Sequence, residues 1–221
     1  MTEHLTLETM DKDGAIREAM AQVVGDTRAD VLRKGIMAGG GLLAGGALMG
    51  LPALAAAAKK GGVSTATVGI LNFALTLEYL EAAFYTEAVK KGALSGQAAK
   101  LAKVIAGHEQ AHVAFLKKAL GSAAVKKPSF DFKGTTSNQA KFLATAYVLE
   151  NTGVAAYSGQ ATNIKEVAVA QAAVSILTVE ARHAGWVGAL TGQAPAPMAF
   201  DAPKTKAQIL SAVTGTGFIT G

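Results

Sequence analysis

Histidine and glutamate stand close together in residues 108–112, His-Glu-Gln-Ala-His, in the middle of a helical pattern. Two imidazoles one helical turn apart, with a glutamate between them, form the H-E-x-x-H motif of zinc proteases. The extended form of that motif continues with a glycine and a third histidine, where this chain has Phe115 and Lys118. No third protein ligand is recognisable, so a zinc protease is the weakest of three functional hypotheses.

Part of the same segment, Glu109-x-x-His112, has a twin in Glu180-x-x-His183, 71 residues further along the chain. Residues three apart on a helix share a face. Each pair therefore presents one carboxylate and one imidazole to the same point.

A lone glutamate precedes each pair, and a tyrosine follows that glutamate after two helical turns. The first set is Glu78 and Tyr85, and the second is Glu150 and Tyr157, with an offset of 72 residues. The chain thus repeats the order E-x6-Y, connection, E-x-x-H. A repeat of this length, registered on residues that are costly to bury, indicates two related halves of one site.

Four carboxylates and two imidazoles that face inward from four helices form a dinuclear iron or manganese site. Two divalent cations neutralise the four buried negative charges, and lysine is absent from the inward stripes of the predicted helices. The predicted metal ligands are Glu78, Glu109, His112, Glu150, Glu180 and His183.

Four further residues near this pattern are candidates for supporting roles. His108 is interpreted as a partner of a ligand or a surface residue rather than a ligand. Glu81 is either an additional carboxylate ligand or an acid at the rim of the site. Tyr85 and Tyr157 are candidate catalytic residues, which pack in the core with a hydrogen bond to a site carboxylate or relay an electron.

This combination of motifs, over roughly residues 64–191, resembles the ferritin-like superfamily, on the branch with two E-x-x-H helices that includes bacterioferritins, rubrerythrins and manganese catalases. It is most similar to exported bacterial ferritin-like domain proteins, which are related to plant desiccation-associated proteins. The resemblance implies an all-α, ferritin-like four-helix bundle with a long crossover between its second and third helices. It also implies that Glu109 and Glu180 bridge two metals.

Two functional hypotheses follow from the resemblance. The first is a protein with two Fe, or alternatively two Mn, that reacts with dioxygen or peroxide while it oxidises iron or another donor. The second is a non-catalytic structural protein of the cell envelope, linked to stress or desiccation. A homo-oligomer is expected in either case.

The composition is consistent with a helical protein that contains no disulfides. The 221 residues are half apolar and include no cysteine, which excludes thiol catalysis and zinc–thiolate sites. The formal charge is +5, and from Ala58 onward there are sixteen Lys and Arg against nine Asp and Glu. Because no nucleic-acid motif accompanies this charge, a solvated lysine surface is favoured and no nucleic-acid partner is expected.

Hydrophobic periodicity and Gly, Pro and capping signals predict the elements of the bundle. The expected helices are 64–90, 95–120, 138–162 and 166–191, with the crossover at 121–137. The tail, 192–221, is expected to be irregular because of three prolines, apart from a short helix near 205–213.

The N-terminal region divides into a polar segment, 1–34, and an uncharged apolar segment, 35–58. One interpretation is a twin-arginine-like export signal, although Ala29 stands where the second arginine belongs. The other is a retained helix that contacts a membrane or a partner, because 24 residues of helix span about 36 Å. The protein is expected to be exported to the periplasm or cell envelope, or alternatively anchored in the membrane.

Overall fold

The computed structural model describes residues 63–220, so the N-terminal segments predicted at 1–34 and 35–58 lie outside the described residues. The described part contains five α-helices, two short 3-10 helices and no β-strand beyond one isolated bridge. The prediction of an all-α fold is confirmed. None of these five helices is both long and apolar enough to cross a membrane.

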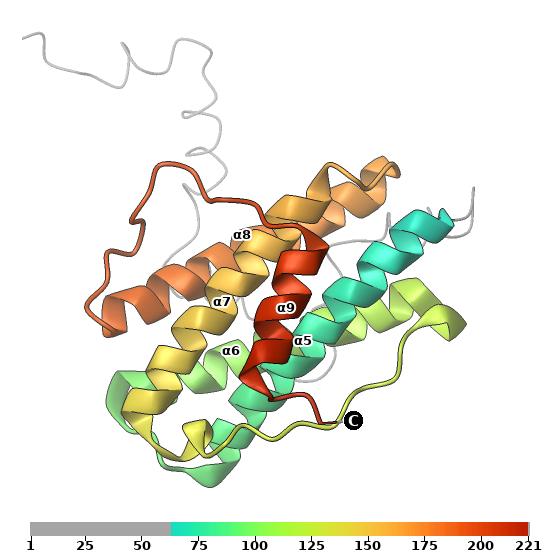
Figure 1. Cartoon of the computed structure of the whole chain (residues 1–221). Coiled ribbons are helices and arrows are strands. Elements are labelled where there is room, and N and C mark those ends of the chain that lie inside the picture. The colour runs from blue at the N-terminus through green and yellow to red at the C-terminus, as the bar shows by residue number, and fades with distance from the viewer. Residues whose placement is uncertain (1–62, 221) are drawn as a thin grey trace, which may run out of the picture. The chain divides into compact units, whose positions relative to one another are not determined.

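Four long helices form the bundle, and α9 lies across it (Figure 1). Their bounds are α5, Thr65–Lys91; α6, Gly96–Leu120; α7, Gln139–Ala161; and α8, Val167–Leu190. Each expected helix agrees with these bounds to within one residue at either end. Helix α5 packs chiefly on α6, and α7 on α8, with further contacts between α5 and α7 and between α6 and α8. Each short connection makes its two helices antiparallel, whereas the long crossover leaves α6 and α7 parallel.

The helix ends follow from local side-chain chemistry. Ser64 and Asn138 begin α5 and α7 with side-chain oxygens that accept hydrogen bonds from backbone N–H groups of the first turn. Helix α5 ends at Gly92, whose backbone is left-handed with φ of 64°. At one end of the bundle Ser95 N–H donates to Gln139, and at the other end Ser64 N–H donates to Glu166. These bonds tie helix starts from the two halves together.

The crossover between α6 and α7 includes the 3-10 helices η2, Gly121–Ala123, and η3, Thr135–Ser137. Asn72 of α5 holds its beginning, because its amide donates to Ala123 O and accepts from Val125 N–H. Further on, the crossover pairs with the C-terminal segment through an isolated bridge between Phe130 and Ile219. The crossover is thus fixed along its length.

Two apolar clusters fill the bundle on either side of its middle. The cluster towards the α5–α6 connection includes Phe84 and Phe142, whose stacked rings have centroids 5.2 Å apart. The other includes Leu75 and Ile176, nearer the α7–α8 connection. The buried glutamates lie at the level between the two clusters, so apolar packing closes the site along the bundle axis.

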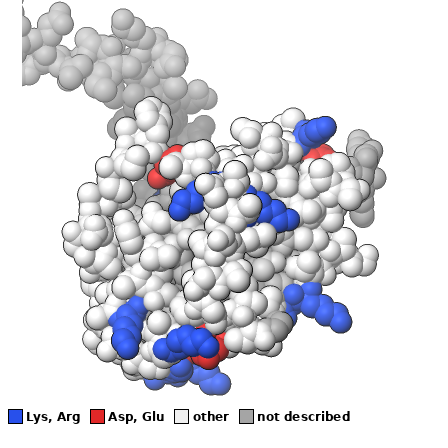
Figure 2. All heavy atoms as spheres, viewed as in Figure 1, with Lys and Arg blue, Asp and Glu red and all other residues white. Residues whose placement is uncertain are grey.

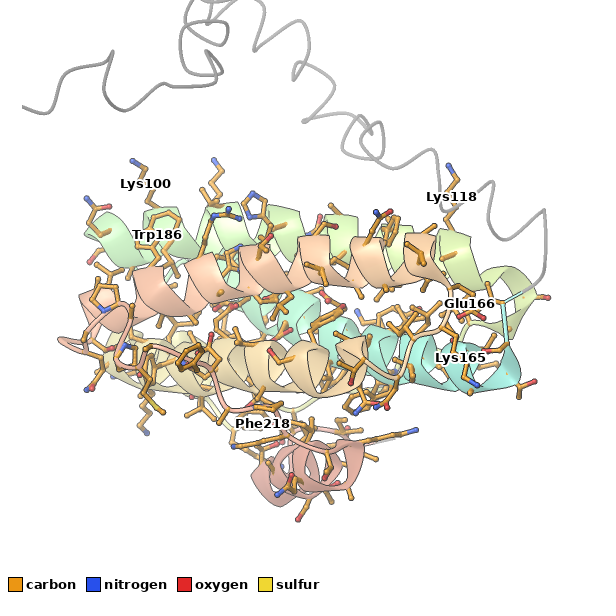
Figure 3. All side chains as sticks on the ribbon, turned by 90° about the horizontal axis from the view of Figure 1, so that it is seen from above. Lys100, Lys118, Lys165, Glu166, Trp186 and Phe218 are labelled. Carbon is orange, nitrogen blue, oxygen red and sulfur yellow. The ribbon has the colours of Figure 1, made fainter. Side chains whose placement is uncertain are left out.

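The C-terminal segment covers the bundle across α5 and α7. Helix α9, Lys206–Thr216, starts with a capping box between Thr205 and Gln208, close to the short helix expected there. Ile209, Val213 and Phe218 are buried in the first apolar cluster, and Figure 3 shows Phe218 beneath the bundle beside α9. The sequence predicted the helix but not this burial.

Gly159 allows the tail to cross α7 closely. Lys204 N–H donates to Ala155 O at 3.0 Å, and a Cβ atom at position 159 would lie only 1.9 Å from Lys204 O. Since backbone atoms cannot yield as a flexible side chain can, any side chain here displaces the segment that leads into α9.

We therefore expect Gly159→Ala to lower the free energy of unfolding by about 1–3 kcal/mol, the usual cost of overpacking. The control is Gly69→Ala, because Gly69 is exposed in α5 and an added Cβ meets nothing within 4 Å. Alanine there is expected to stabilise by up to about 1 kcal/mol. Urea unfolding measures both variants, and equal stabilities would contradict the close approach.

Candidate metal centre

All six predicted ligands come together in the middle of the bundle. Helix α5 supplies one glutamate, α6 a glutamate and a histidine, α7 one glutamate, and α8 a glutamate and a histidine. The four glutamates have no exposed surface and His183 is 2% exposed. The residues are Glu78, Glu109, His112, Glu150, Glu180 and His183.

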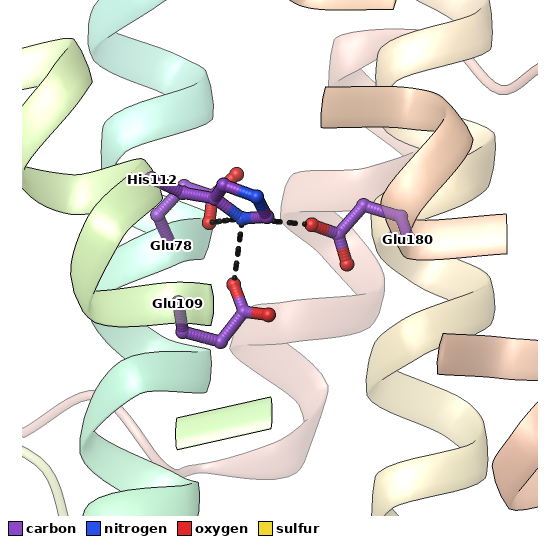
Figure 4. A group of neighbouring side chains, drawn as sticks. All are labelled: Glu78, Glu109, His112 and Glu180. Carbon is purple, nitrogen blue, oxygen red and sulfur yellow. Dashed lines mark hydrogen bonds and ion pairs between the residues drawn. The ribbon is translucent and has the colours of Figure 1, made fainter. Parts of the chain in front are cut away.

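His112 is the centre of the first group (Figure 4). Its Nδ1 atom lies 3.2 Å from a carboxylate oxygen of Glu78, 3.2 Å from one of Glu109 and 3.1 Å from one of Glu180. Three carboxylates from three different helices thus face the same imidazole nitrogen.

His183 is the centre of a second, matching group. Its Nδ1 atom lies 3.2 Å from oxygens of Glu109 and of Glu150, and 3.5 Å from an oxygen of Glu180. In each group the ligand atoms lie within 4.8 Å of one another. Glu109 and Glu180 belong to both groups, which is the position that the resemblance implies for bridging carboxylates.

Several carboxylate and imidazole atoms of the second group converge but make no hydrogen bond. Within the described residues, five buried atoms have no hydrogen-bond partner: Glu109 Oε1, Glu150 Oε2, both carboxylate oxygens of Glu180, and His183 Nδ1. Buried polar atoms normally have partners, and converging carboxylate and imidazole atoms without them fit metal cations. The residues present therefore suit a pair of metal ions.

The two tyrosines bind glutamates of the opposite half. Tyr157 on α7 donates to Glu78 on α5 at 2.5 Å, and Tyr85 on α5 donates to Glu150 on α7. Tyrosine and glutamate are seven residues apart in both helices, and these helices run antiparallel. Each tyrosine therefore lies level with the glutamate of the other helix and two turns from its own.

Glu81 adds a fifth carboxylate on one side of the centre. It is 4% exposed, and its counterpart in the repeat is Gly153. A Cβ atom on Gly153 would contact Glu81 Oε1 at 3.4 Å and Glu180 Oε2 at 3.8 Å. The missing side chain at position 153 leaves room for the Glu81 carboxyl. Glu81 thus lies inside the centre, although it belongs to neither four-residue group.

His108 is exposed and lies outside both groups, but it contacts one ligand. Its Nδ1 is 2.8 Å from His183 Nε2, and the two rings lie edge to edge with their planes 14° apart and their centroids 5.1 Å apart. Because His108 contacts His183 and belongs to neither group, His108 and His112 do not form the zinc-binding histidine pair of a zinc protease.

The charges of the centre shift the pKa values of both site histidines upwards. Burial alone would lower the pKa of His183, but contacts with Glu109 and Glu150 outweigh burial and raise it to about 12. The pKa of His112 is also raised, against burial, by the charge of Glu78.

Three carboxyl groups of the centre have pKa values above the ordinary value for glutamate. Burial raises the pKa of Glu150 to about 7, and burial and neighbouring carboxylates raise those of Glu81 and Glu109 well above the ordinary value. Glu180 is the exception, since its contacts with both histidines outweigh burial and lower its pKa to about 2. Without a metal, protons must balance much of the negative charge.

Comparison with known proteins agrees with this geometry. The sequence matches the ferritin-like domain family over residues 66–193, more than half of the chain. The chain belongs to the ferritin-like family. The match begins in α5 and ends just after α8, so the four helices that carry the centre make up the ferritin-like domain. No curated protein matches the chain.

Sequence reasoning identified the ferritin-like ligand candidates but not all of their neighbours. It left open whether His108 lies at the surface or beside a ligand, and the structure shows both. It did not find the space that Gly153 provides for Glu81. The repeat itself carries the signal, because aligning Glu78 with Glu150 places Glu81 opposite Gly153.

The ferritin-like domain stripped of metal should lose stability as the pH rises. Glu150 and His183 have raised pKa values when folded, so the stability they contribute is present below the ordinary values of 4.5 and 6.5. It is lost as the pH rises through about 7 for Glu150 and towards about 12 for His183.

We expect the thermal midpoint of metal-stripped protein to fall between about pH 5 and about pH 9, and to fall less in metal-loaded protein, where cations replace the protons. Differential scanning calorimetry in both states measures this. A metal-stripped midpoint that is constant or rises over this range would contradict the argument.

Proposed function

We propose that the centre binds two Fe, or alternatively two Mn, and reacts with dioxygen or peroxide while it oxidises iron or another donor. The observation that carries the proposal is the pair of four-residue groups that share Glu109 and Glu180. This arrangement supports the double E-x-x-H type of dimetal centre that the sequence resemblance implies.

The charge and type of the donors support this choice of metal. Five glutamates lie in one buried cluster, and two divalent cations offset most of their charge. Oxygen-rich donors with two imidazoles suit iron or manganese better than zinc or copper. On the face shown in Figure 2, by contrast, most of the charged side chains are Lys or Arg.

Tyr85 and Tyr157 hold the two outer carboxylates in place. Each phenol donates to one oxygen of a glutamate, and the other oxygen of that glutamate faces a histidine Nδ1 in the centre. The carboxylate cannot rotate without breaking a buried hydrogen bond, which preorganises it as a ligand. We propose that this positioning is the main contribution of the two tyrosines to the reaction.

Two bound Fe²⁺ would supply one electron each, so that two Fe²⁺, dioxygen and two protons give two Fe³⁺ and hydrogen peroxide. The apolar clusters on both sides close the centre along the bundle axis. His112, with 13% of its side chain exposed, is the most accessible of the six ligands. These features favour small partners such as dioxygen or peroxide.

We expect Glu109→Ala and Glu180→Ala each to lose both metals, because each removes a carboxylate common to the two groups. His112→Ala should first weaken only one metal. Elemental analysis of metal per chain measures this. The control is Glu87→Ala, since Glu87 lies outside the centre and bonds Lys91 and Thr136. Wild-type metal content in both glutamate variants would remove the dinuclear site.

The reaction is tested by mixing Fe²⁺-loaded protein, prepared without oxygen, with dioxygen or peroxide. We expect ferric absorbance to appear together with consumption of oxidant. Tyr85→Phe and Tyr157→Phe should react about 10–100-fold more slowly, as expected when the partner of a ligand is lost. Protein that binds two metals but consumes neither oxidant supports the alternative, a non-catalytic structural protein linked to stress or desiccation.

We further propose that the protein is exported to the periplasm or cell envelope, directed by the apolar segment 35–58, or is anchored in the membrane by it. Mass spectrometry of protein from each cell fraction tests this through the mass of its N-terminus. An intact N-terminus on protein from the periplasm would contradict cleavage. The expected homo-oligomer is tested by light scattering.

A further inference from the structure

The two halves of the centre differ at one position next to the ligands. The 71-residue offset aligns Glu109 with Glu180 and His112 with His183, and it aligns His108 with Val179. Valine has no polar side-chain group. Only one half therefore carries a histidine directly before its E-x-x-H pair.

His108 contacts the ligand histidine of the opposite half. Its Nδ1 lies 2.8 Å from His183 Nε2, and the rings are nearly parallel, 14° apart. The other ring nitrogen of His183, Nδ1, faces the oxygens of Glu109 and Glu150. One nitrogen of His183 thus faces the centre, and the other makes a contact outside it.

This contact suits the form of His183 that binds a cation through Nδ1. A neutral imidazole that binds a cation through Nδ1 has its hydrogen on Nε2 and donates it. His108 Nδ1 is placed to accept that hydrogen bond. The hydrogen bond between the two rings also restricts rotation of His183, so the ligand atom points into the centre before a cation arrives.

His112 has no such support. Its Nδ1 faces Glu78, Glu109 and Glu180, but within residues 63–220 its Nε2 makes no hydrogen bond to another side chain or to the backbone. It is also more exposed than His183, at 13% of its side chain against 3%. The two otherwise matching groups are therefore unequal in preorganisation.

We infer that His108 is a positioning residue that makes the two metal positions unequal, so that the position of Glu150 and His183 binds its ion first and more tightly. This inference rests on the proposed dimetal function. It concerns the order and affinity of binding, which the proposed function leaves open.

The test is a titration of metal-free protein with Mn²⁺, followed by calorimetry and by the electron paramagnetic resonance of free and bound ions. Wild type should bind two ions in two steps of different affinity. His112→Ala should keep the tight step and weaken or lose the other, which assigns the steps. In His108→Ala the tight step should weaken by about 10–100-fold, so that the two steps approach each other.

Two further variants separate positioning from packing. His108→Asn keeps an acceptor oxygen near the place of Nδ1 and should recover most of the tight step. His108→Phe keeps a flat ring but offers no acceptor and should behave as His108→Ala. The three His108 variants should have the wild-type thermal midpoint when free of metal, because His108 is exposed.

The outcomes are distinguishable. Two ions bound by wild type and an unchanged tight step in His108→Ala overturn this inference and leave the proposed function in place. Wild type that binds no metal overturns the proposed function itself. A general loss of stability in His108→Ala that Asn does not restore shows a packing role and also overturns the inference.

Discussion

The burial of several carboxylates in one core is the constraint on which the rest of this structure depends. Glu78, Glu109, Glu150 and Glu180 have no exposed surface, and each charge would be costly to bury alone. Protons, histidines or cations must balance them together. The structure places two imidazoles among the four carboxylates, in two groups whose ligand atoms converge, so bound cations would offset the cost that opposes folding.

The internal repeat explains how the two halves of the centre are joined. Because α5 and α7 are antiparallel and share the same seven-residue spacing, Tyr85 meets Glu150 and Tyr157 meets Glu78. One spacing therefore produces two crossed bonds that join the halves. The hydrogen bonds from Ser95 to Gln139 and from Ser64 to Glu166 join the same halves at the bundle ends.

Departures from the repeat distinguish the two sides of the centre. Glu81 occupies space that its counterpart Gly153 leaves free, and His108 contacts His183 where its counterpart is Val179. A site built from two matching halves would treat two metals alike. These positions are where the two halves of the chain differ, and they involve residues at the edge of the ligand pattern rather than the predicted ligands.

The sequence by itself determined the helices, the all-α fold and the six ligand candidates, because helical periodicity and the spacing of Glu and His are local properties of the chain. Only the tertiary structure decided which residues meet across helices. The crossed tyrosines, the contact of His108 with His183 and the burial of Ile209 from the tail depend on helix direction and relative height in the bundle. Those are set by the crossover and by packing between residues far apart in sequence, which no local spacing encodes.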